Sequence, residues 1–236
     1  GQWAMIFNES VKNDSNPVDK TEKFMFDGER LIQHIIKQRY FEEEISNEVN
    51  LSYSDNQVTV TTDYLTLVYT LNSEGYASQC VYSLSSQNRI YQFSYSAEGY
   101  LTGIVENIDN TEYSSTSLTY ENGDITSISS KMNGLENKFI YEPGEESSTY
   151  HLPCLGLLEI HPLTFHIEAL YAGLLGKDPR HFTIRSCPAG SNDEKTIYSY
   201  EFDKKGNPSR MICQTTYAGG QASYYPYTRN ISVSFE

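Results

Sequence analysis

The stretch YQFSYSAEGYLTGI, residues Tyr91–Ile104, has an aromatic residue at every second position, then a glycine, then a return to aliphatic residues. Similar stretches lie before and after it, and their glycines, Gly75, Gly99 and Gly123, are each 24 residues from the next. Alternation with a period of two is typical of a strand with one buried face. Glycine adopts the positive φ that tight hairpin turns require. The repeat therefore predicts a series of β-hairpins that share one turn design.

Turn signals recur along most of the chain. We predict hairpin turns at Asn72–Gly75, Ala97–Gly99, Asn122–Gly123, Asp27-Gly28, Asp55-Asn56, Asn133-Gly134 and Lys205–Asn207. In the strand of the opening stretch, the predicted core face carries Tyr91, Phe93 and Tyr95. Sequential hairpins indicate an all-β, antiparallel, up-and-down meander. Many such strands form a strongly curved sheet or a barrel-like shell.

Two segments depart from this rhythm at the start of the chain. Residues 1–22 are polar and contain Asn, Asp, Ser and Pro, so we expect an N-terminal tether or a lead-in strand there. Residues 23–236 are then a single meander domain. Residues 29–40 are interpreted as a return strand, although their aliphatic spacing also fits one face of a helix.

An aliphatic insertion near residues 155–180 interrupts the hairpins. Within it, apolar residues at helical spacing predict one helix over residues 163–175, which begins after Pro162 and ends before Gly176. The apolar stripe expected to dock on the sheet is Leu163, Ile167, Leu170, Tyr171 and Leu174. His166 and Glu168 lie off that stripe and are expected to be more exposed. A docked helix of this kind would cap the end of the sheet and shape a pocket there.

Composition narrows the class of protein. The formal net charge is −14, which argues against nucleic acid or an anionic membrane surface as a partner, because phosphate attraction requires Lys and Arg. The chain contains no apolar run long enough for a membrane-spanning helix. Its 20 tyrosines and 10 phenylalanines supply the large buried side chains that a β core needs.

The four cysteines are Cys80, Cys154, Cys187 and Cys213. Their wide spacing contains no CxxC pair, so zinc-ribbon chemistry is not indicated. Four cysteines allow three full disulfide pairings, and the sequence does not choose among these and four buried free thiols.

Two features together resemble a known family. One is the aromatic repeat with its turn glycine, as in FSYSAEGYLTGI and YSYEFDKKGNPSRM, and the other is the inserted ALYAGLLGKDPRHF. Together they resemble an uncharacterised family of Bacteroidetes envelope proteins, a domain of unknown function with a porin-like fold. The repeat is also similar to the tyrosine-aspartate repeats of wrapping β shells. The family resemblance implies an exported protein, usually lipid-anchored through a cysteine that would precede Gln2, and it implies no catalytic residues.

The best candidates for chemistry lie in the insertion, in LEIHPLTFHIE. Glu159, His161, His166 and Glu168 are sound ligand types for zinc, but the segment has no HExxH motif and its histidines are five residues apart. Ordinary loop and helix roles are therefore preferred, with no metal site and no cofactor. His161 and His166 remain candidates for ligand binding.

The second candidate site is the tyrosine-rich segment SYYPYTR near the C-terminus. Exposed tyrosines stack on sugars or anchor a protein partner, which makes Tyr224, Tyr225 and Tyr227 candidate binding residues. The alternative is that these side chains belong to the β core.

We therefore expect a non-enzymatic cell-envelope protein, a monomeric β module that binds an unknown envelope ligand or protein. It would lie in the periplasm or at the outer membrane or cell surface as a lipid-anchored protein. The first alternative is a metal-dependent hydrolase that uses the insertion. The second is an outer-membrane barrel, which ranks lower because the predicted outward positions are Ser, Thr and Gln and the mean hydropathy is −0.52.

Overall fold

The computed structural model describes residues 1–12, 18–40, 42–84, 87–191, 193–216 and 227–236. Over these residues the chain forms sixteen strands and almost no helix. The first eight strands are β1 (Gln2–Lys12), β2 (Val18–Asp27), β3 (Arg30–Tyr40), β4 (Glu43–Ser54), β5 (Gln57–Thr61), β6 (Thr66–Leu71), β7 (Ala77–Leu84) and β8 (Gln87–Tyr95). The other eight are β9 (Leu101–Ile108), β10 (Thr111–Glu121), β11 (Asp124–Met132), β12 (Leu135–Ser147), β13 (His181–Pro188), β14 (Lys195–Phe202), β15 (Pro208–Thr216) and β16 (Tyr227–Phe235).

The strands pair antiparallel in sequence order, and the order closes into a barrel because β1 pairs with both β2 and β16. The predicted all-β meander is therefore confirmed. The three repeated turns are confirmed as well, since each joins two paired strands and Gly75, Gly99 and Gly123 have φ of 84°, 97° and 81°. Residues 30–40 form strand β3, as interpreted from the sequence.

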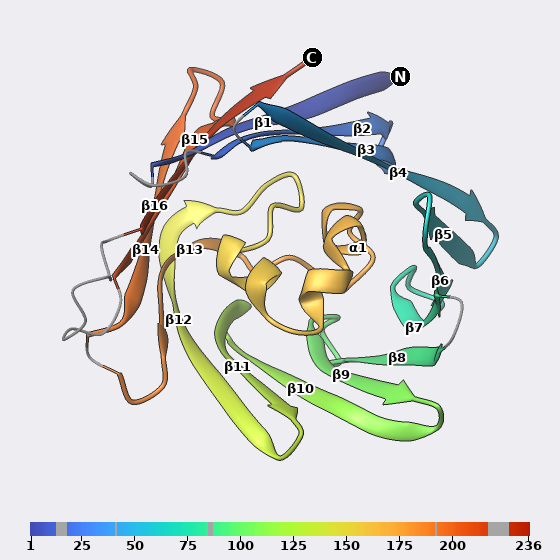
Figure 1. Cartoon of the computed structure of the whole chain (residues 1–236). Coiled ribbons are helices and arrows are strands. Elements are labelled where there is room, and N and C mark those ends of the chain that lie inside the picture. Colours follow the sequence, from blue (N-terminus) through green and yellow to red (C-terminus); the bar gives the residue numbers. More distant parts are fainter. Residues whose placement is uncertain (13–17, 41, 85–86, 192, 217–226) are drawn as a thin grey trace. The chain divides into compact units, whose positions relative to one another are not determined.

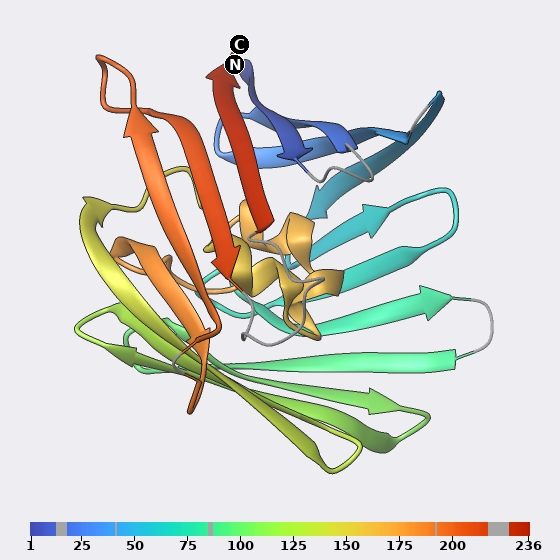
Figure 2. The ribbon, with the colours of Figure 1, turned by 60° about the vertical axis from the view of Figure 1, so that its left-hand side comes forward.

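By its internal contacts the chain separates into two compact units. Unit 1 comprises residues 1–49 and 184–236, and unit 2 comprises residues 50–183. Unit 2 contains β5 to β12 and the segment between β12 and β13, residues 148–180, which we call the plug. The plug contains three short helical pieces, η1 (Leu155–Glu159), η2 (Leu163–Phe165) and α1 (Ile167–Tyr171). Figures 1 and 2 show these pieces against the concave side of the unit 2 strands.

The register of the opening stretch follows the sequence pattern. Tyr91 is 0% exposed and Phe93 is 7% exposed, whereas the intervening Gln92 and the following Ser94 are exposed. Tyr95 is half-buried, and its hydroxyl donates to the backbone oxygen of Ala77 over 2.6 Å. The alternating aromatic residues thus lie on the buried face of the strand, as predicted.

The plug ends in a short non-helical segment, residues 174–180, which crosses the three repeated hairpins one after another; we call it the seam. Three backbone N–H···O=C hydrogen bonds of 2.8–2.9 Å make the joins, from Ala77 to Leu174, from Lys177 to Gly99 and from Arg180 to Gly123. The seam residues in these bonds are three apart. Three residues of extended chain span about 10 Å, which matches the width of two neighbouring strands. The repeat of turns therefore also supplies evenly spaced docking points for the plug.

Gly176 makes the seam's close approach to the sheet. Its φ is +90°, and a Cβ at this position would lie 2.7 Å from the carbonyl oxygen of Gly99 and 3.0 Å from the amide nitrogen of Leu101. Only glycine combines this backbone conformation with this contact. The segment YAGLLGK, which carried the family resemblance, thus contains the residue that lets the seam lie on the β8–β9 turn.

The predicted helix over residues 163–175 was wrong in its extent. The α-helix covers only Ile167–Tyr171, because residues 163–165 form a separate 3-10 turn and Gly173, with φ +72°, ends the helical path. The expected stripe is only partly right, since Leu163, Tyr171 and Leu174 are buried while Ile167 and Leu170 are half-buried. The expected exposure of His166 is also wrong, because its side chain is fully buried.

Unit 1 has its own core on the inward face of β1, β2 and β3. Trp3 stacks on Phe26 with ring centroids 4.3 Å apart, and Phe24 stacks on His34 at 4.2 Å. Residues 2–12 form strand β1, which pairs with β2 from Val18 onward.

The four cysteines are free thiols. Burial raises the pKa of Cys80 to about 12, so this thiol stays protonated and unreactive at neutral pH. Among the described residues, no helix is long and apolar enough to cross a membrane.

Candidate functional site

A group of polar and charged side chains lies between the plug and the sheet of unit 2. Arg89 and Tyr91 come from β8, Glu106 from β9, and His161 and His166 from the plug. We call these five residues the polar cluster. The strands bring them together because β8 and β9 are paired with Tyr91 directly opposite Glu106. The repeat that builds the hairpins therefore also builds the sheet side of this cluster.

Glu106 is the centre of the polar cluster and is fully buried. Its Oε1 accepts from the ring Nε2 of His161 over 2.6 Å and from the hydroxyl of Ser114 over 2.8 Å, and its Oε2 lies 3.7 Å from the Arg89 guanidinium. Burial by itself raises the pKa of this carboxyl. The hydrogen bonds from His161 and Ser114 outweigh that effect, and the pKa is lowered from its usual value. Glu106 is therefore held as a buried carboxylate.

His166 is held in a different way. Its Nδ1 lies 2.7 Å from the hydroxyl of Tyr69, and its ring packs edge-on against Tyr91 at 4.4 Å and Phe93 at 5.3 Å between centroids. Burial lowers the pKa of His166 to about 3, so the imidazole is neutral at physiological pH. The hydrogen bond to Tyr69 and the aromatic packing fix the ring and aim its other nitrogen away from that bond.

The polar cluster contains buried polar atoms that form no hydrogen bond with the described part of the chain. Among the described residues, the buried side-chain atoms without a hydrogen-bond partner are Arg89 Nε, Tyr91 Oη, Glu106 Oε2 and His166 Nε2. Glu106 and Arg89 lie near enough to Tyr91 to act on the pKa of its phenol, but no pair there has hydrogen-bond geometry. Buried polar atoms in native proteins are nearly always paired, so four such atoms in one cluster require an explanation.

Aromatic rings surround Arg89 at the outer side of the cluster. The guanidinium carbon lies 5.5 Å from the ring centre of Tyr82, 6.0 Å from that of Tyr113 and 5.8 Å from that of Phe165. The side chains of Arg89 and His161 remain 18% and 24% exposed. The polar cluster thus reaches solvent through a rim of half-buried aromatic side chains, whereas Glu106 and Tyr91 lie behind it.

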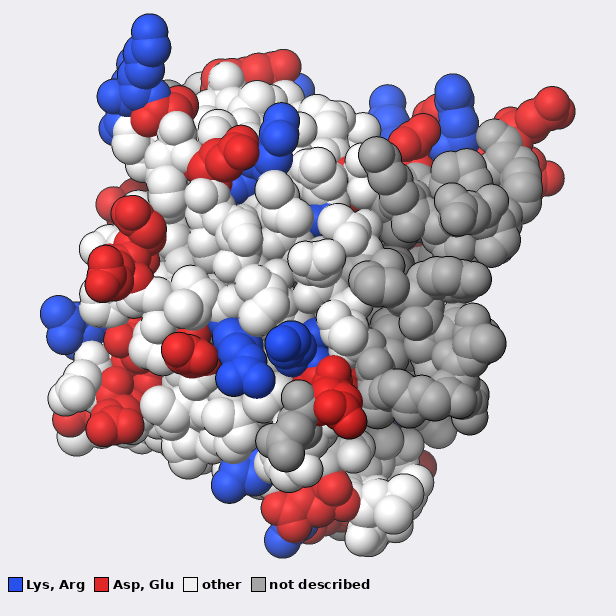
Figure 3. Space-filling model, turned by 90° about the vertical axis from the view of Figure 1, so that its left-hand side faces the viewer, with Lys and Arg blue, Asp and Glu red and all other residues white. Residues whose placement is uncertain are grey.

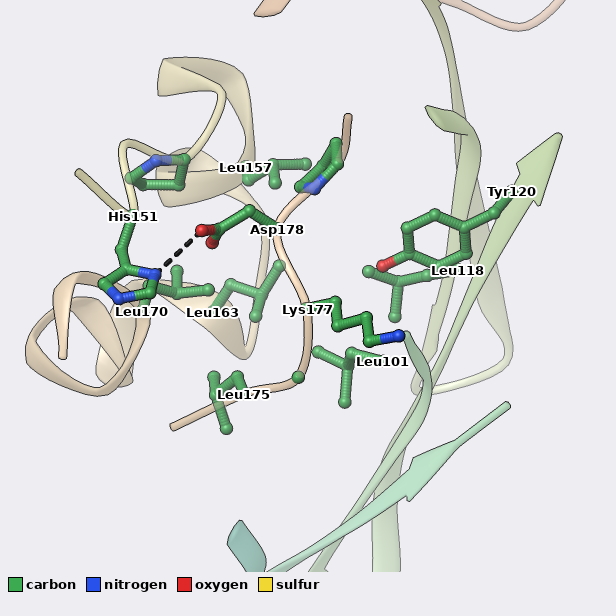
Figure 4. Close-up of a pocket in the computed structure, with 13 residues that line it drawn as sticks. Leu101, Leu118, Tyr120, His151, Leu157, Leu163, Leu170, Leu175, Lys177 and Asp178 are labelled. Carbon is green, nitrogen blue, oxygen red and sulfur yellow. Dashed lines mark hydrogen bonds and ion pairs between the residues drawn. The ribbon is translucent and has the colours of Figure 1, made fainter. Parts of the chain in front are cut away.

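The other end of the same strands holds an apolar pocket, which we call the leucine pocket. Figure 4 shows leucine side chains from β9, β10 and the plug around it, with the hydrogen-bonded pair His151 and Asp178 at one side. His151 Nδ1 and Asp178 Oδ2 are 2.8 Å apart. The pocket measures about 40 Å³. Sites for small-molecule ligands typically measure about 300–1,000 Å³, so the leucine pocket is a packing gap rather than a binding site. A small pocket thus lies between the plug and the sheet, where the docked segment was expected to shape one.

The sequence-predicted site residues divide into two groups. His161 and His166 both lie in the polar cluster, but with separate partners, Glu106 and Tyr69. No three His, Cys, Asp or Glu side chains in the described part of the chain are arranged to hold a metal ion. Tyr224 and Tyr225 lie outside the described residues, and Tyr227 begins strand β16.

Sequence reasoning missed the sheet half of the polar cluster, Arg89, Tyr91 as a polar group, and Glu106. The spacing of two of these residues in the sequence nevertheless indicates that they are buried. Glu106 follows Ile104 at a spacing of two, and Arg89 precedes Tyr91 at the same spacing, so both charges fall on the core face of an alternating strand. A charged residue in phase with buried neighbours needs a partner or a function.

Comparison with known proteins supports the fold. Residues 24–210 match the model of a family described as "Domain of unknown function (DUF4595) with porin-like fold". The chain belongs to this family. The resemblance predicted from the repeat and from YAGLLGK is thereby confirmed.

Two solved structures share the fold of this protein over nearly the whole chain. A porin-like protein from Bacteroides uniformis ATCC 8492 is 26% identical, with a TM-score of 0.88, over 99% of this chain and 96% of that chain. A porin-like protein from Bacteroides vulgatus ATCC 8482 is 11% identical, with a TM-score of 0.57, over 96% of each chain, which shows likeness of fold alone. No curated protein matches the chain.

Proposed function

We propose that the protein is a non-enzymatic, monomeric β module of the cell envelope that binds a small polar ligand at the polar cluster. The observation that carries this proposal is the set of four buried polar atoms that have no partner within the described protein. Leaving a buried polar group unpaired costs about 1–3 kcal/mol. A set of four is therefore expensive unless an incoming molecule uses it.

The arrangement of the cluster favours binding over catalysis. The Ser114 hydroxyl donates a hydrogen bond to Glu106, and the Nε2 of His161 is hydrogen-bonded to the same carboxylate. In the described part of the chain, no hydroxyl is therefore hydrogen-bonded to His161 Nε2 as a nucleophile would be to its base. The residues hold charge and hydrogen-bonding groups in fixed places, which is what recognition of a polar ligand requires.

The outward positions of unit 2 favour a sheet that faces water. On β8 they are Gln92 and Ser94, and on β10 they include Ser117 and Thr119. A barrel embedded in lipid needs an apolar band on these positions. Figure 3 shows the side of the molecule on which β14, β15 and β16 of unit 1 lie, and there too acidic and basic side chains are interspersed among uncharged ones. The porin-like fold is therefore used here as a filled scaffold in unit 2 rather than as a lipid-facing one.

We place the protein in the envelope as an exported, lipid-anchored module. The support is the family's porin-like fold and the similarity of the chain to a solved porin-like protein from Bacteroides. Fractionation of Bacteroides cells that express the natural precursor tests this location. The precursor should enter the membrane fraction and be released by detergent, whereas residues 1–236 alone should stay monodisperse without detergent. A domain that needs detergent to remain monodisperse would favour an outer-membrane barrel instead.

The binding role is tested without assuming the kind of ligand. A mixed library of neutral, anionic and cationic small molecules is screened by ligand-observed NMR against the parent, Tyr91→Phe and the control Tyr120→Phe. Tyr120 lines the leucine pocket, so its substitution removes a hydroxyl at the other end of the same strands. Binding that Tyr91→Phe weakens and Tyr120→Phe leaves unchanged supports the proposal. A library without a binder, or binding that is indifferent to Tyr91→Phe, contradicts it.

A further inference from the structure

From the charges and hydrogen-bonding groups of the polar cluster, we infer that its ligand is a neutral, hydroxyl-bearing molecule, with a sugar ring as the representative class. This inference rests on the proposed binding function and names the ligand of the same site. It follows from three properties of the site: its net charge, the mixture of donors and acceptors, and the aromatic rim.

The charges of the cluster are already balanced inside the protein. The Glu106 carboxylate faces the Arg89 guanidinium at 3.7 Å, and the deeply buried His166 is neutral at physiological pH. An anionic ligand would compete with Glu106 for Arg89, and a cationic ligand would compete with Arg89 for Glu106. Separating a buried ion pair is strongly unfavourable. A neutral ligand leaves the pair intact.

The atoms that lack partners form a mixed set. Arg89 Nε is a donor, Glu106 Oε2 is an acceptor, and Tyr91 Oη serves as either. The role of His166 Nε2 depends on the tautomer, which is set by the direction of the hydrogen bond between Nδ1 and Tyr69. Hydroxyl groups both donate and accept, so two or three of them on one molecule match this set. A purely anionic or purely cationic group satisfies only half of it.

The rim adds an apolar surface beside these polar atoms. Tyr82, Tyr113 and Phe165 are half-buried and lie around the Arg89 side chain. A sugar ring has an apolar C–H face and a hydroxyl edge. The aromatic rings suit the first, and the atoms behind Arg89 suit the second. Because Glu106 and Tyr91 are fully buried, the Arg89 side chain must shift along the rim to admit the ligand.

Three probes with the same ring test the class: methyl glucoside, which is neutral, glucuronate, which carries a carboxylate, and glucosamine, which carries an ammonium group. Affinities for the parent, Tyr91→Phe and Tyr120→Phe are measured by titration calorimetry. We expect methyl glucoside to bind more tightly than both charged probes. Tyr91→Phe should weaken its binding about tenfold, the effect of one hydrogen bond, and Tyr120→Phe should leave it unchanged.

A second readout uses the parent alone. The long-range 1H–15N spectrum of the His166 ring should change at Nε2 when methyl glucoside is added, so the test does not depend on a variant that folds. Tighter binding of glucuronate or glucosamine, or no binding of methyl glucoside, overturns the inference on ligand class. The proposed function then still stands or falls by the mixed library, because a charged binder that is sensitive to Tyr91→Phe would support that function while contradicting this inference.

Discussion

The leucine pocket and the polar cluster lie at opposite ends of the same strands and contact the same plug, yet the contacts between plug and sheet differ at the two ends. At the leucine end, apolar side chains from β9, β10 and the plug pack together, and the seam joins plug to sheet through backbone hydrogen bonds. At the other end, every join involves a sheet side chain. His161 bonds to Glu106 and His166 to Tyr69 through their rings, and the backbone oxygen of His161 accepts from the hydroxyl of Ser130. Four polar atoms there have no hydrogen-bond partner among the residues that the structure describes. The difference agrees with the proposal that packing at the leucine end holds the plug against the sheet and that the polar cluster binds a ligand.

The largest expected effect is the loss of stability in acid through His166. Its pKa is about 6.5 when unfolded and about 3 when folded, so the unfolded chain binds the proton first as pH falls. The stabilisation is complete above pH 6.5 and declines as the pH falls toward 3, by about 5 kcal/mol at most, at about 1.4 kcal/mol for each unit.

Comparison of the parent with His166→Gln isolates the contribution of His166 to the pH dependence of stability. Urea unfolding between pH 7 and pH 5 should show a slope for the parent that exceeds that of the variant by about 2 kcal/mol over the range. Glu106 has a lowered pKa, so its effect on stability changes mainly as the pH falls below the ordinary pKa of a glutamate. It therefore adds little to the slope between pH 7 and pH 5. Parallel pH profiles for the two proteins would mean that His166 is not held neutral in the folded state.

The seam supplies the next largest effect. Gly176→Ala would place a methyl group 2.7 Å from the Gly99 carbonyl oxygen in a backbone conformation that alanine avoids. We expect a loss of about 4 kcal/mol in the free energy of unfolding, from strain and overpacking together. Gly134→Ala is the matched control, since Gly134 has φ +75° and open space around its Cβ position. Equal losses in the two variants, measured by urea unfolding, would remove the close approach of the seam as a cause.

Packing at the leucine pocket is expected to contribute about as much. Leu163 lines the pocket and is 1% exposed. Leu163→Ala should cost about 3 kcal/mol, within the usual range for buried leucines. Leu135 is 72% exposed, and Leu135→Ala should change the free energy of unfolding by less than about 0.5 kcal/mol. Thermal and urea melts that show no difference between these variants would contradict a plug that is packed at this end.

The sequence predicted the hairpins well because their information is local. In Tyr91–Tyr95, the alternation of aromatic and polar residues determines which side chains are buried. The turn after this strand is predicted from a single residue, Gly99. The same locality explains why β3 was interpreted correctly as a strand. Both properties are read from neighbouring residues and need no knowledge of the rest of the chain.

The plug was predicted poorly because its structure depends on distant partners. Helical spacing in residues 163–175 suggested one helix, but Gly176 must reach the β8–β9 turn, about eighty residues earlier, so the chain leaves the helical path at Gly173. Likewise His166 looked like a surface residue until Tyr69, 97 residues away, supplied its hydrogen bond. Local periodicity carries no information about such pairings.

Two tyrosines beside His166 test the central claim most directly. Tyr69 and Tyr91 are both buried and both contact the His166 ring. Among the described residues, the Tyr69 hydroxyl has a partner with hydrogen-bond geometry, whereas the Tyr91 hydroxyl lies near Glu106 and Arg89 without that geometry. The measurement is the free energy of unfolding of Tyr69→Phe and Tyr91→Phe in urea at neutral pH. We predict a loss of about 1–2 kcal/mol for Tyr69→Phe, since it removes a buried hydrogen bond, and no loss or a small gain for Tyr91→Phe. A loss for Tyr91→Phe as large as that for Tyr69→Phe would show that the Tyr91 hydroxyl already has its partner within the folded protein, and the polar cluster would then be part of the core rather than a ligand site.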